Sequence, residues 1–341
     1  MDLTTTYLGV TLRSPLLASA SPVTARLDAL RAVADAGVGA VVLPSLFEEQ
    51  VRQQELADLA MTERHEHAFG EAQTYLPGGP TVDLGGTAPY LRHVERAAET
   101  LDIPVIASLN GSTPGGWTGI ARSMETAGAA AIELNVYAVP GRTTLTGAQV
   151  EARHLDIVSD VVAAVSVPVA VKLSPFFSST AAIALAIREV GASGLVLFNR
   201  FVQPDVDVEA LTVHPFPTLS TRDEGRLART WIALLHGRLG GASLAATTGV
   251  EDSADVAAYL LAGADVVMTA SALLRHGPAH AADLLTGLEV WAERKGFASL
   301  DAVRGALAVG HDADGDRVER AGYVAALTQA RSVYGDLTEE S

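Results

Sequence analysis

The chain has 341 residues, of which 48% are hydrophobic and 19% charged, so it can bury a large core and is not disordered as a whole. Its 24 basic and 40 acidic residues give a formal net charge of −16, which disfavours binding to nucleic acid or to an anionic membrane surface. Cysteine is absent, which excludes disulfides, iron–sulfur clusters and thiolate zinc sites within the chain. We see no secretory signal pattern and no membrane-spanning apolar stretch, and therefore expect a cytoplasmic protein.

Eight short apolar segments recur along the chain and are typical of strands that are buried on both faces. In chain order they are residues 16–20, 39–43, 104–109, 130–136, 168–173, 194–198, 243–247 and 265–269. Stretches with helical periodicity separate most of them, at residues 25–36, 116–127, 148–165, 179–190, 222–238, 252–262 and 277–294. Four glycines fit the ends of helices, where a positive φ favours glycine: Gly37, Gly128, Gly191 and Gly263.

This alternation of strands and helices predicts an α/β fold, a (β/α)8 TIM barrel that forms a single domain over residues 1–341. An open doubly wound sheet is the alternative. We expect the N-terminal residues to form a hairpin that closes the bottom of the barrel, and residues 296–337 to form a C-terminal helical extension packed outside it. Residues 44–90 and 200–221 are expected to be long loops over the carboxyl-terminal face, where barrel enzymes carry their active sites.

Lys172 is one of only two lysines in the chain, and it lies within the apolar segment PVAVKLSPFF. An ammonium group inside a barrel is costly to bury unless an anionic group or ligand meets it. Three interpretations stay open. Lys172 pairs with a neighbouring strand, for example through Glu133; it is a Schiff-base nucleophile; or it is a fixed positive charge beside an electron-accepting cofactor.

Other polar residues collect where the predicted strands end. Asn110, Asn135 and Asn199 end the third, fourth and sixth strands, and amide side chains suit the edge of a flat ring that is rich in amides. The segments TTGVED (247–252) and TASALL (269–274) are small-residue turns that lead into helices and offer N–H groups to an anion. These ends therefore predict a ligand site with an anionic group at one side.

Together these segments resemble the FMN-dependent dihydroorotate dehydrogenase family, from Leu3 to about residue 306. The resemblance rests on ELNV (133–136), VAVKLSPFF (169–177), LFN (197–199), the TTGVED turn and SALLRHGP (271–278). It is closest to the subgroup usually called dihydroorotate dehydrogenase-like proteins. It implies an FMN oxidoreductase of the kind that serves pyrimidine biosynthesis, acting on a CH–CH bond, with FMN over the top of the barrel.

The resemblance also implies which residues bind the cofactor. Lys172 would contact the flavin ring, where a cation stabilises the anionic reduced flavin, and Asn135 and Asn199 would touch flavin or substrate. Ala20, Ser21 and Ser45 would lie at the flavin ring. The phosphate would rest on the backbone amides of Thr248, Gly249, Ala270 and Ser271. The full implied set is Ala20, Ser21, Ser45, Asn135, Lys172, Asn199, Thr248, Gly249, Ala270 and Ser271.

The chain departs from the family where the catalytic base is expected. Family members carry a Cys or Ser in the run after the fourth-strand asparagine, whereas this run reads Asn135-Val136-Tyr137-Ala138-Val139-Pro140. Ala138 occupies the base position and cannot take a proton, and Pro140 replaces a substrate-binding asparagine. Proton abstraction by such a base typically contributes about 10²–10⁴-fold to the reaction rate, so its absence disfavours ordinary dihydroorotate oxidation. The substrate therefore stays open. Tyr137 either exchanges a proton in a flavin-dependent reaction or only packs the loop. Pro44 replaces a family lysine after the second strand.

Two other functions stay open from the residues. One is a flavin- or phosphate-binding barrel without redox turnover that serves as a subunit, and the other is a Schiff-base lyase that uses Lys172. The expected partners are a small-molecule substrate, a redox partner protein and a second copy of the chain in a homodimer. The histidines of ERHEHAFG lie in a charged loop, so no metal site is predicted.

Overall fold

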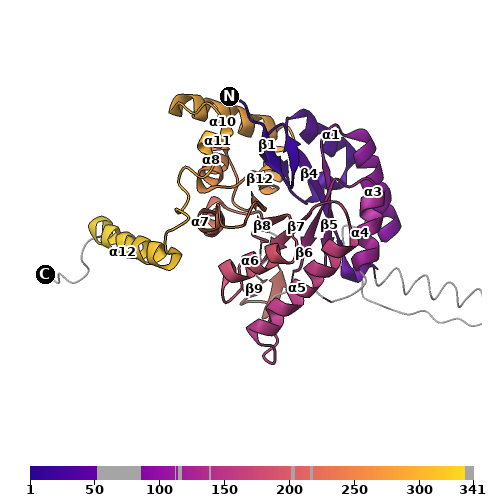
Figure 1. Ribbon diagram of the computed structural model, residues 1–341, viewed down its shortest axis with the longest axis horizontal. Coiled ribbons are helices and arrows are strands. Elements are labelled where there is room, and N and C mark those ends of the chain that lie inside the picture. Colours follow the sequence, from indigo (N-terminus) through magenta and orange to yellow (C-terminus); the bar gives the residue numbers. More distant parts are fainter. Residues whose placement is uncertain are drawn as a thin grey trace, which may run out of the picture.

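The computed structural model describes residues 1–51, 86–111, 113, 117–137, 140–200, 204–215 and 218–334. Eight parallel strands close a barrel in the order β11-β12-β3-β4-β5-β6-β7-β8 (Figure 1). They are β3 (Leu16–Ala18), β4 (Ala40–Phe47), β5 (Val105–Asn110), β6 (Ala131–Asn135), β7 (Val169–Leu173), β8 (Gly194–Leu197), β11 (Ser243–Ala246) and β12 (Val266–Thr269). The closed sheet confirms the predicted (β/α)8 barrel and excludes the open doubly wound sheet.

Helices between successive strands cover the outside of the barrel (Figure 1). They are α1 (Leu27–Asp35), α3 (Thr87–Thr100), α4 (Trp117–Thr126), α5 (Gly147–Ala164), α6 (Thr180–Glu189), α7 (Gly225–Leu235), α8 (Ser253–Ala262), α9 (Ser271–His276) and α10 (His280–Lys295). Side-chain caps fix where some begin: the Asp252 carboxylate accepts the N–H groups of Ala254 and Asp255 at the start of α8. The four glycines predicted to end helices all have positive φ, from 95° to 114°.

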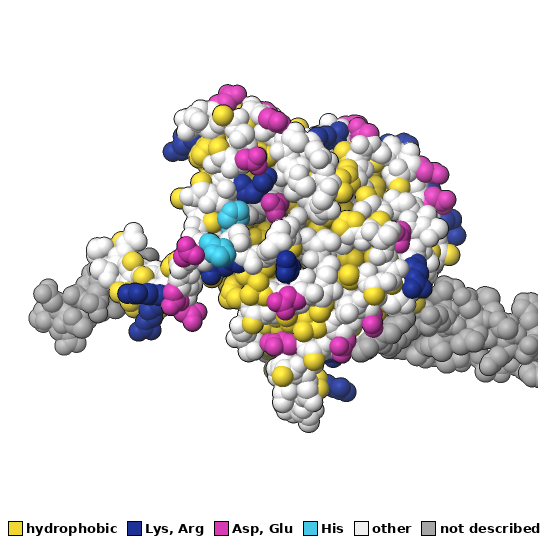
Figure 2. All heavy atoms as spheres, in the orientation of Figure 1, with side chains coloured by type: hydrophobic (Ala, Val, Ile, Leu, Met, Phe, Trp, Pro, Cys, Tyr) yellow, Lys and Arg dark blue, Asp and Glu magenta, His cyan; other side chains and the backbone are white. Residues whose placement is uncertain are grey.

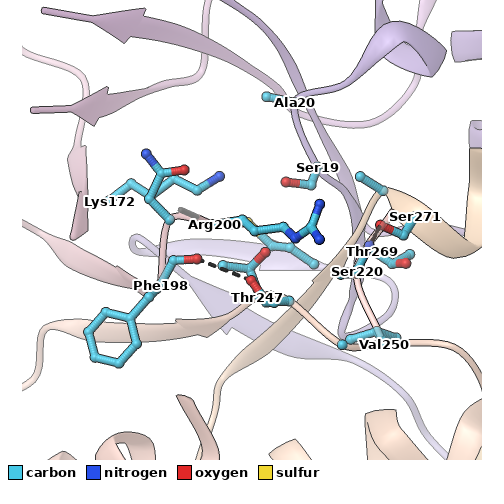
Figure 3. Close-up of a pocket in the computed structure, with 15 residues that line it drawn as sticks. Ser19, Ala20, Lys172, Phe198, Arg200, Ser220, Thr247, Val250, Thr269 and Ser271 are labelled. Carbon is cyan, nitrogen blue, oxygen red and sulfur yellow. Dashed lines mark hydrogen bonds between the residues drawn. The ribbon is translucent and has the colours of Figure 1, made fainter. Parts of the chain in front are cut away.

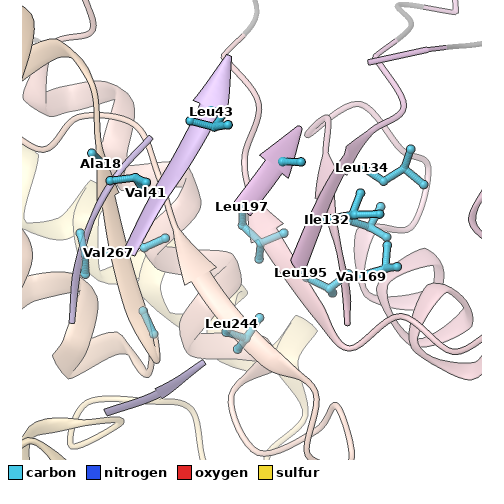
Figure 4. Close-up of a cluster of buried hydrophobic side chains, with 14 of the residues drawn as sticks. Ala18, Val41, Leu43, Ile132, Leu134, Val169, Leu195, Leu197, Leu244 and Val267 are labelled. Carbon is cyan, nitrogen blue, oxygen red and sulfur yellow. The ribbon is translucent and has the colours of Figure 1, made fainter. Parts of the chain in front are cut away.

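Apolar side chains pack against both faces of the barrel sheet. The outward-facing ones lie under the helices, and Figure 4 shows this layer for Ala18, Val41, Leu43, Ile132, Leu134, Val169, Leu195, Leu197, Leu244 and Val267. The inward-facing ones, among them Val42, Ile106, Val196 and Met268, form a second buried cluster. Burial on both sides explains why each strand reads as a continuous apolar run.

A short antiparallel hairpin closes the bottom of the barrel. It consists of β1 (Thr5–Tyr7) and β2 (Val10–Leu12). Tyr7, Leu8 and Leu12 are buried in the same cluster as the inward-facing strand residues, including Ala40 at the start of β4. The predicted N-terminal hairpin is therefore confirmed.

The C-terminal extension is helical, as predicted, but only its first part packs against the barrel. In α11 (Leu300–Val303) both Leu300 and Val303 are buried. In α12 (Gly315–Tyr334) most described side chains are exposed, and the helix extends away from the barrel in Figure 1. The prediction that the extension packs outside the barrel therefore holds for α11 but is wrong for most of α12, whose apolar side chains, among them Tyr323, Val324 and Leu327, are exposed.

The structure describes only parts of the two long connections, and their bounds differ from the predicted ones. Strand β4 continues to Phe47 rather than ending at residue 43, and α3 begins at Thr87, inside the segment that was predicted to be a loop through residue 90. Residues 52–85 lie outside the described residues. The second connection contains the hairpin of β9 (Pro204–Asp207) and β10 (Thr212–Pro215) and returns to the barrel at the buried Ser220.

Acidic and basic side chains are interspersed around the face seen in Figure 2, and apolar side chains are exposed over its middle. The negative net charge is therefore distributed on this face rather than gathered in one patch. Within the described part of the chain, no helix is both long enough and apolar enough to cross a bilayer.

Candidate active site

An open pocket lies at the carboxyl ends of the barrel strands (Figure 3). It encloses about 530 Å³, including space that opens to solvent, which is within the range of small-molecule sites. Its walls come from the ends of β3, β7, β8, β11 and β12. The lining residues are Ser19, Ala20, Lys172, Phe198, Asn199, Arg200, Ser220, Thr247, Thr248, Gly249, Val250, Met268, Thr269, Ala270 and Ser271. The pocket thus brings together seven of the ten residues that the sequence suggested for the cofactor.

Lys172 reaches this pocket from inside the barrel and is itself 9% exposed. Its Nζ donates to Oε1 of Glu133 at 3.4 Å, and Glu133 is 1% exposed. The two residues come from the adjacent strands β7 and β6, whose register pairs Asn135 with Lys172. The ion pair with Glu133 that the sequence left open is therefore present, and it coexists with a place in the pocket wall. The second oxygen of Glu133 is buried without a hydrogen-bond partner among the described residues.

Three asparagines meet where β5, β6 and β8 end. The register places Asn110 opposite Asn135. The side chain of Asn199 donates from Nδ2 to Oδ1 of Asn135 at 3.0 Å, and its backbone N–H donates to the carbonyl of Leu173 at 2.7 Å. Asn135 does not line the pocket itself but fixes the orientation of Asn199, which does. Together the amides offer donors and acceptors at the mouth.

The turn after β11 has an unusual backbone that other residues hold in place. Thr248 has a φ of 80°, which is rare for a β-branched residue. The hydroxyl of Tyr259 donates to the Thr248 carbonyl at 2.7 Å, and the Thr248 hydroxyl donates to the carbonyl of Phe198 at 3.3 Å, the dashed contact in Figure 3. Gly249 follows with a φ of 69°, and a Cβ there would lie 2.6 Å from the backbone nitrogen of Gly225. The turn therefore needs glycine at this position.

The structure adds lining residues that the sequence reasoning missed, foremost Arg200. Its Nε donates to Oε2 of Glu224 at 2.8 Å and its Nη2 to Oε1 at 3.3 Å, and further bonds go to the carbonyl and hydroxyl of Thr218. Partial burial tends to raise the pKa of Glu224, but hydrogen bonds from Arg200 and Thr221 hold this pKa below its usual value. The sequence feature that could have pointed to Arg200 is its place directly after Asn199, which ends the sixth predicted strand. Ser19 and Ser220 are further lining residues that were missed, whereas Thr247 and Thr269 belong to the two turns that were predicted to meet an anion.

Two suggested cofactor residues lie near the mouth but outside the pocket wall. The Ser45 hydroxyl in β4 is 2.8 Å from the hydroxyl of Ser108 in β5. Ser21 follows the pocket residue Ala20, and its hydroxyl is buried without a hydrogen-bond partner in the described part of the chain. Their contacts with a cofactor stay predictions. Within the described residues no cluster of acidic and histidine side chains could hold a metal ion, and the segment ERHEHAFG lies outside them.

Comparison with known proteins identifies the family. A sequence model of the family described as dihydroorotate dehydrogenase matches residues 83–291, more than half of the chain. The chain belongs to the dihydroorotate dehydrogenase family. Its members are FMN-dependent oxidoreductases that act on CH–CH bonds, and the chain is an enzyme of this type.

Individual relatives agree with the family assignment at modest identity. A dihydroorotate dehydrogenase B (NAD(+)) catalytic subunit of Methanothermobacter thermautotrophicus is 26% identical, covering 89% of this chain and 97% of the relative. The catalytic subunit of the same name from Methanocella arvoryzae is 30% identical over 66% of this chain and 69% of the relative. A dihydroorotate dehydrogenase A (fumarate) of Lactiplantibacillus plantarum is 29% identical over 59% of this chain and 67% of the relative.

The pocket of this dihydroorotate dehydrogenase family member fits FMN at both ends. At one side, the first turn of α9 leaves amide N–H groups without intrahelical partners, and the nearby Thr269 hydroxyl is buried with no hydrogen-bond partner among the described residues. These donors suit a phosphate group. At the other side, the Lys172 ammonium and the Asn199 amide suit the polar edge of a flavin ring.

The family's catalytic position is only partly visible. Tyr137 is half-buried and follows the end of β6 by two residues. Ala138 and Val139 lie outside the described residues, so the missing base stays a prediction from the sequence. Pro44 lies within β4, at an irregularity in the pairing of β4 with β5 between Val42 and Ser45.

Proposed function

We propose that this enzyme uses FMN in the pocket of Figure 3 to oxidise or reduce a CH–CH bond in a small carbonyl compound related to dihydroorotate, and that dihydroorotate itself is a poor substrate. One observation carries the proposal: Lys172 and Asn199 share a single pocket with the Thr248–Gly249 turn. A cation and an amide at one side and anion-binding amides at the other match the two ends of FMN.

The residues that the family resemblance implies for the cofactor then have separate tasks. The turn amides of Thr248, Gly249, Ala270 and Ser271 hold the phosphate, and Ala20, Ser21 and Ser45 lie towards the ring. Lys172 supplies a fixed positive charge at the ring edge, and Glu133 keeps its ammonium in place. Asn135 orients Asn199 towards ring and substrate. Bound FMN supplies the hydride acceptor or donor, which no side chain of the chain can replace.

The proton that accompanies the hydride needs a side chain of the enzyme. Ala138 cannot serve, so oxidation of dihydroorotate lacks its usual base. Tyr137 is two residues from Asn135, and we assign to its phenol the role of proton donor when an activated C=C bond is reduced. The missing base favours a substrate other than dihydroorotate.

The assembly belongs to the same proposal. Two of the relatives named above are catalytic subunits, and a catalytic subunit by its name works with other subunits. These names support a separate redox partner protein. A homodimer of this chain and a location in the cytoplasm are further parts of the proposal. Light scattering of the purified protein, alone and after mixing with cell extract fractions that reoxidise its flavin, tests the first two.

Of the two other functions left open by the sequence, one is disfavoured and one is kept as the second candidate. A Schiff-base reaction at Lys172 is disfavoured, because it would take the ammonium from a buried carboxylate that has one further oxygen without a partner among the described residues. A flavin-binding barrel without turnover is the second candidate, and the alanine at position 138 is the observation that favours it.

Anaerobic reduction distinguishes these possibilities. The FMN-loaded protein is mixed with dihydroorotate, and the absorbance of oxidised flavin near 450 nm is followed; in the reverse direction, chemically reduced protein is mixed with a panel of cyclic enones and unsaturated amides. We expect little bleaching by dihydroorotate and rapid reoxidation by at least one acceptor. If no compound changes the flavin in either direction, the binding barrel without turnover replaces the proposed function.

A further inference from the structure

Arg200 is a charged residue in the pocket to which the proposed function gives no task. It follows Asn199 at the end of β8, and its side chain points across the pocket in Figure 3, towards the side where Ser220 and Ser271 lie. We infer that the Arg200 guanidinium binds the phosphate group of the cofactor and that Glu224 is the residue that positions it. This inference rests on the proposed FMN site and deepens it.

The negative net charge of the protein bears on how a phosphate binds in the pocket. A phosphate that enters a protein of net charge −16 is repelled at long range, so a local cation beside the turn amides would favour its binding. Two cationic side chains, Lys172 and Arg200, are among the residues that line the pocket. Lys172 is buried and paired with Glu133 on the far side of the pocket from Ser271 in Figure 3. Arg200 is therefore the cation that is placed for the phosphate.

The hydrogen bonds of the Arg200 guanidinium leave one donor for a ligand. A guanidinium has five N–H groups, and the bonds to Glu224 and Thr218 use four of them. One N–H of Nη1 is left without a partner among the described residues. Because the fork is already ordered by the carboxylate of Glu224, binding an anion would immobilise little additional side chain.

The segment that holds Arg200 also reaches the predicted phosphate turn. Thr218, which accepts two of the Arg200 bonds, lies two residues before Ser220. The Ser220 backbone N–H donates to the Ser271 hydroxyl at 3.0 Å, and the two hydroxyls are 2.9 Å apart. Ser271 is the first residue of α9. Arg200, Ser220 and the amides of α9 are thus linked around one side of the pocket.

The test compares FMN with riboflavin, which has the same ring but no phosphate. Apo-protein is titrated with each flavin while flavin fluorescence is followed, for wild type and for Arg200→Met, which keeps most of the stem and removes the charge. We expect FMN to bind about 10–100-fold more weakly to the variant, as for loss of a charge-assisted contact, and riboflavin affinity to stay within about twofold. Glu224→Gln should weaken FMN in the same selective way but less.

Arg226→Met is the matched control, because this arginine lies in the same segment of the chain but is exposed and pairs with Asp223. It should change neither affinity. Thermal unfolding of each apo-variant checks that it is folded. An equal loss of FMN and riboflavin in Arg200→Met would assign Arg200 a structural role and overturn the inference, as would no loss at all. A wild-type protein that binds neither flavin would instead overturn the proposed function, and the inference with it.

Discussion

Replacing Lys172 by methionine removes one half of a buried ion pair. The Nζ–Oε1 distance to Glu133 is 3.4 Å, and the two side chains are 10% and 1% exposed. Glu133 would be left with two buried oxygens, one of which already lacks a hydrogen-bond partner among the described residues. Breaking a buried pair in this way typically costs about 3–5 kcal/mol, so we expect the free energy of unfolding of the apo-protein to fall by about that amount.

Urea unfolding followed by circular dichroism measures this loss, and two further variants sharpen it. Lys172→Met/Glu133→Gln removes both charges, so it should be clearly less destabilised than Lys172→Met alone. Lys295→Met changes the other lysine of the chain, which is exposed, and should lie within about 0.5 kcal/mol of wild type. A Lys172→Met loss as small as that of Lys295→Met, or no recovery in the double variant, would refute a buried Lys172–Glu133 pair.

Three other changes test separate parts of the account. Gly249→Ala places a side chain on a left-handed backbone and close to Gly225, so it should cost at least about 1–2 kcal/mol in urea unfolding and weaken FMN binding; wild-type behaviour would show that the turn is not fixed as described. Ala138→Ser restores a group that can take a proton and should raise the rate of anaerobic flavin reduction by dihydroorotate, by up to about 10²–10⁴-fold; no rise with FMN still bound would mean that the pocket has diverged further. Burial, with Glu133 and Asp265 adding, raises the pKa of Tyr7 well above its usual value, whereas an unfolded tyrosine ionises near pH 10. The unfolded chain then binds fewer protons above about pH 10, so stability falls as pH rises; Tyr7→Phe should make this alkaline decline shallower than in wild type, and an unchanged slope would count against the buried hydroxyl.

The fold could be predicted well because its signals are local. A strand that is buried on both faces must be apolar throughout, and a helix that ends in a left-handed residue favours glycine, as at Gly263. Two details of the fold were predicted wrongly, the end of the second strand and the packing of α12. The second strand was predicted to end at residue 43, but it accommodates Pro44 at an irregularity in its pairing and continues to Phe47. In α12 helical periodicity predicted the helix but could not show that nothing in the described chain covers it.

The site could be predicted only as far as strand ends determine it. Lys172, Asn199 and Gly249 are placed by the barrel itself, since the carboxyl ends of parallel strands meet at one mouth. Arg200 could not be assigned in this way, because its position depends on Glu224, which is 24 residues further along the chain. The same holds for Ser220, which a long connection brings back to the pocket.

The most direct test of the central claim is the amount of FMN that the protein binds. The apo-protein is titrated with FMN, excess cofactor is removed, and the flavin released on denaturation is measured by its absorbance and compared with the protein concentration. The pocket described above predicts one FMN per chain and a yellow protein. A protein that stays colourless and retains no FMN would contradict the account.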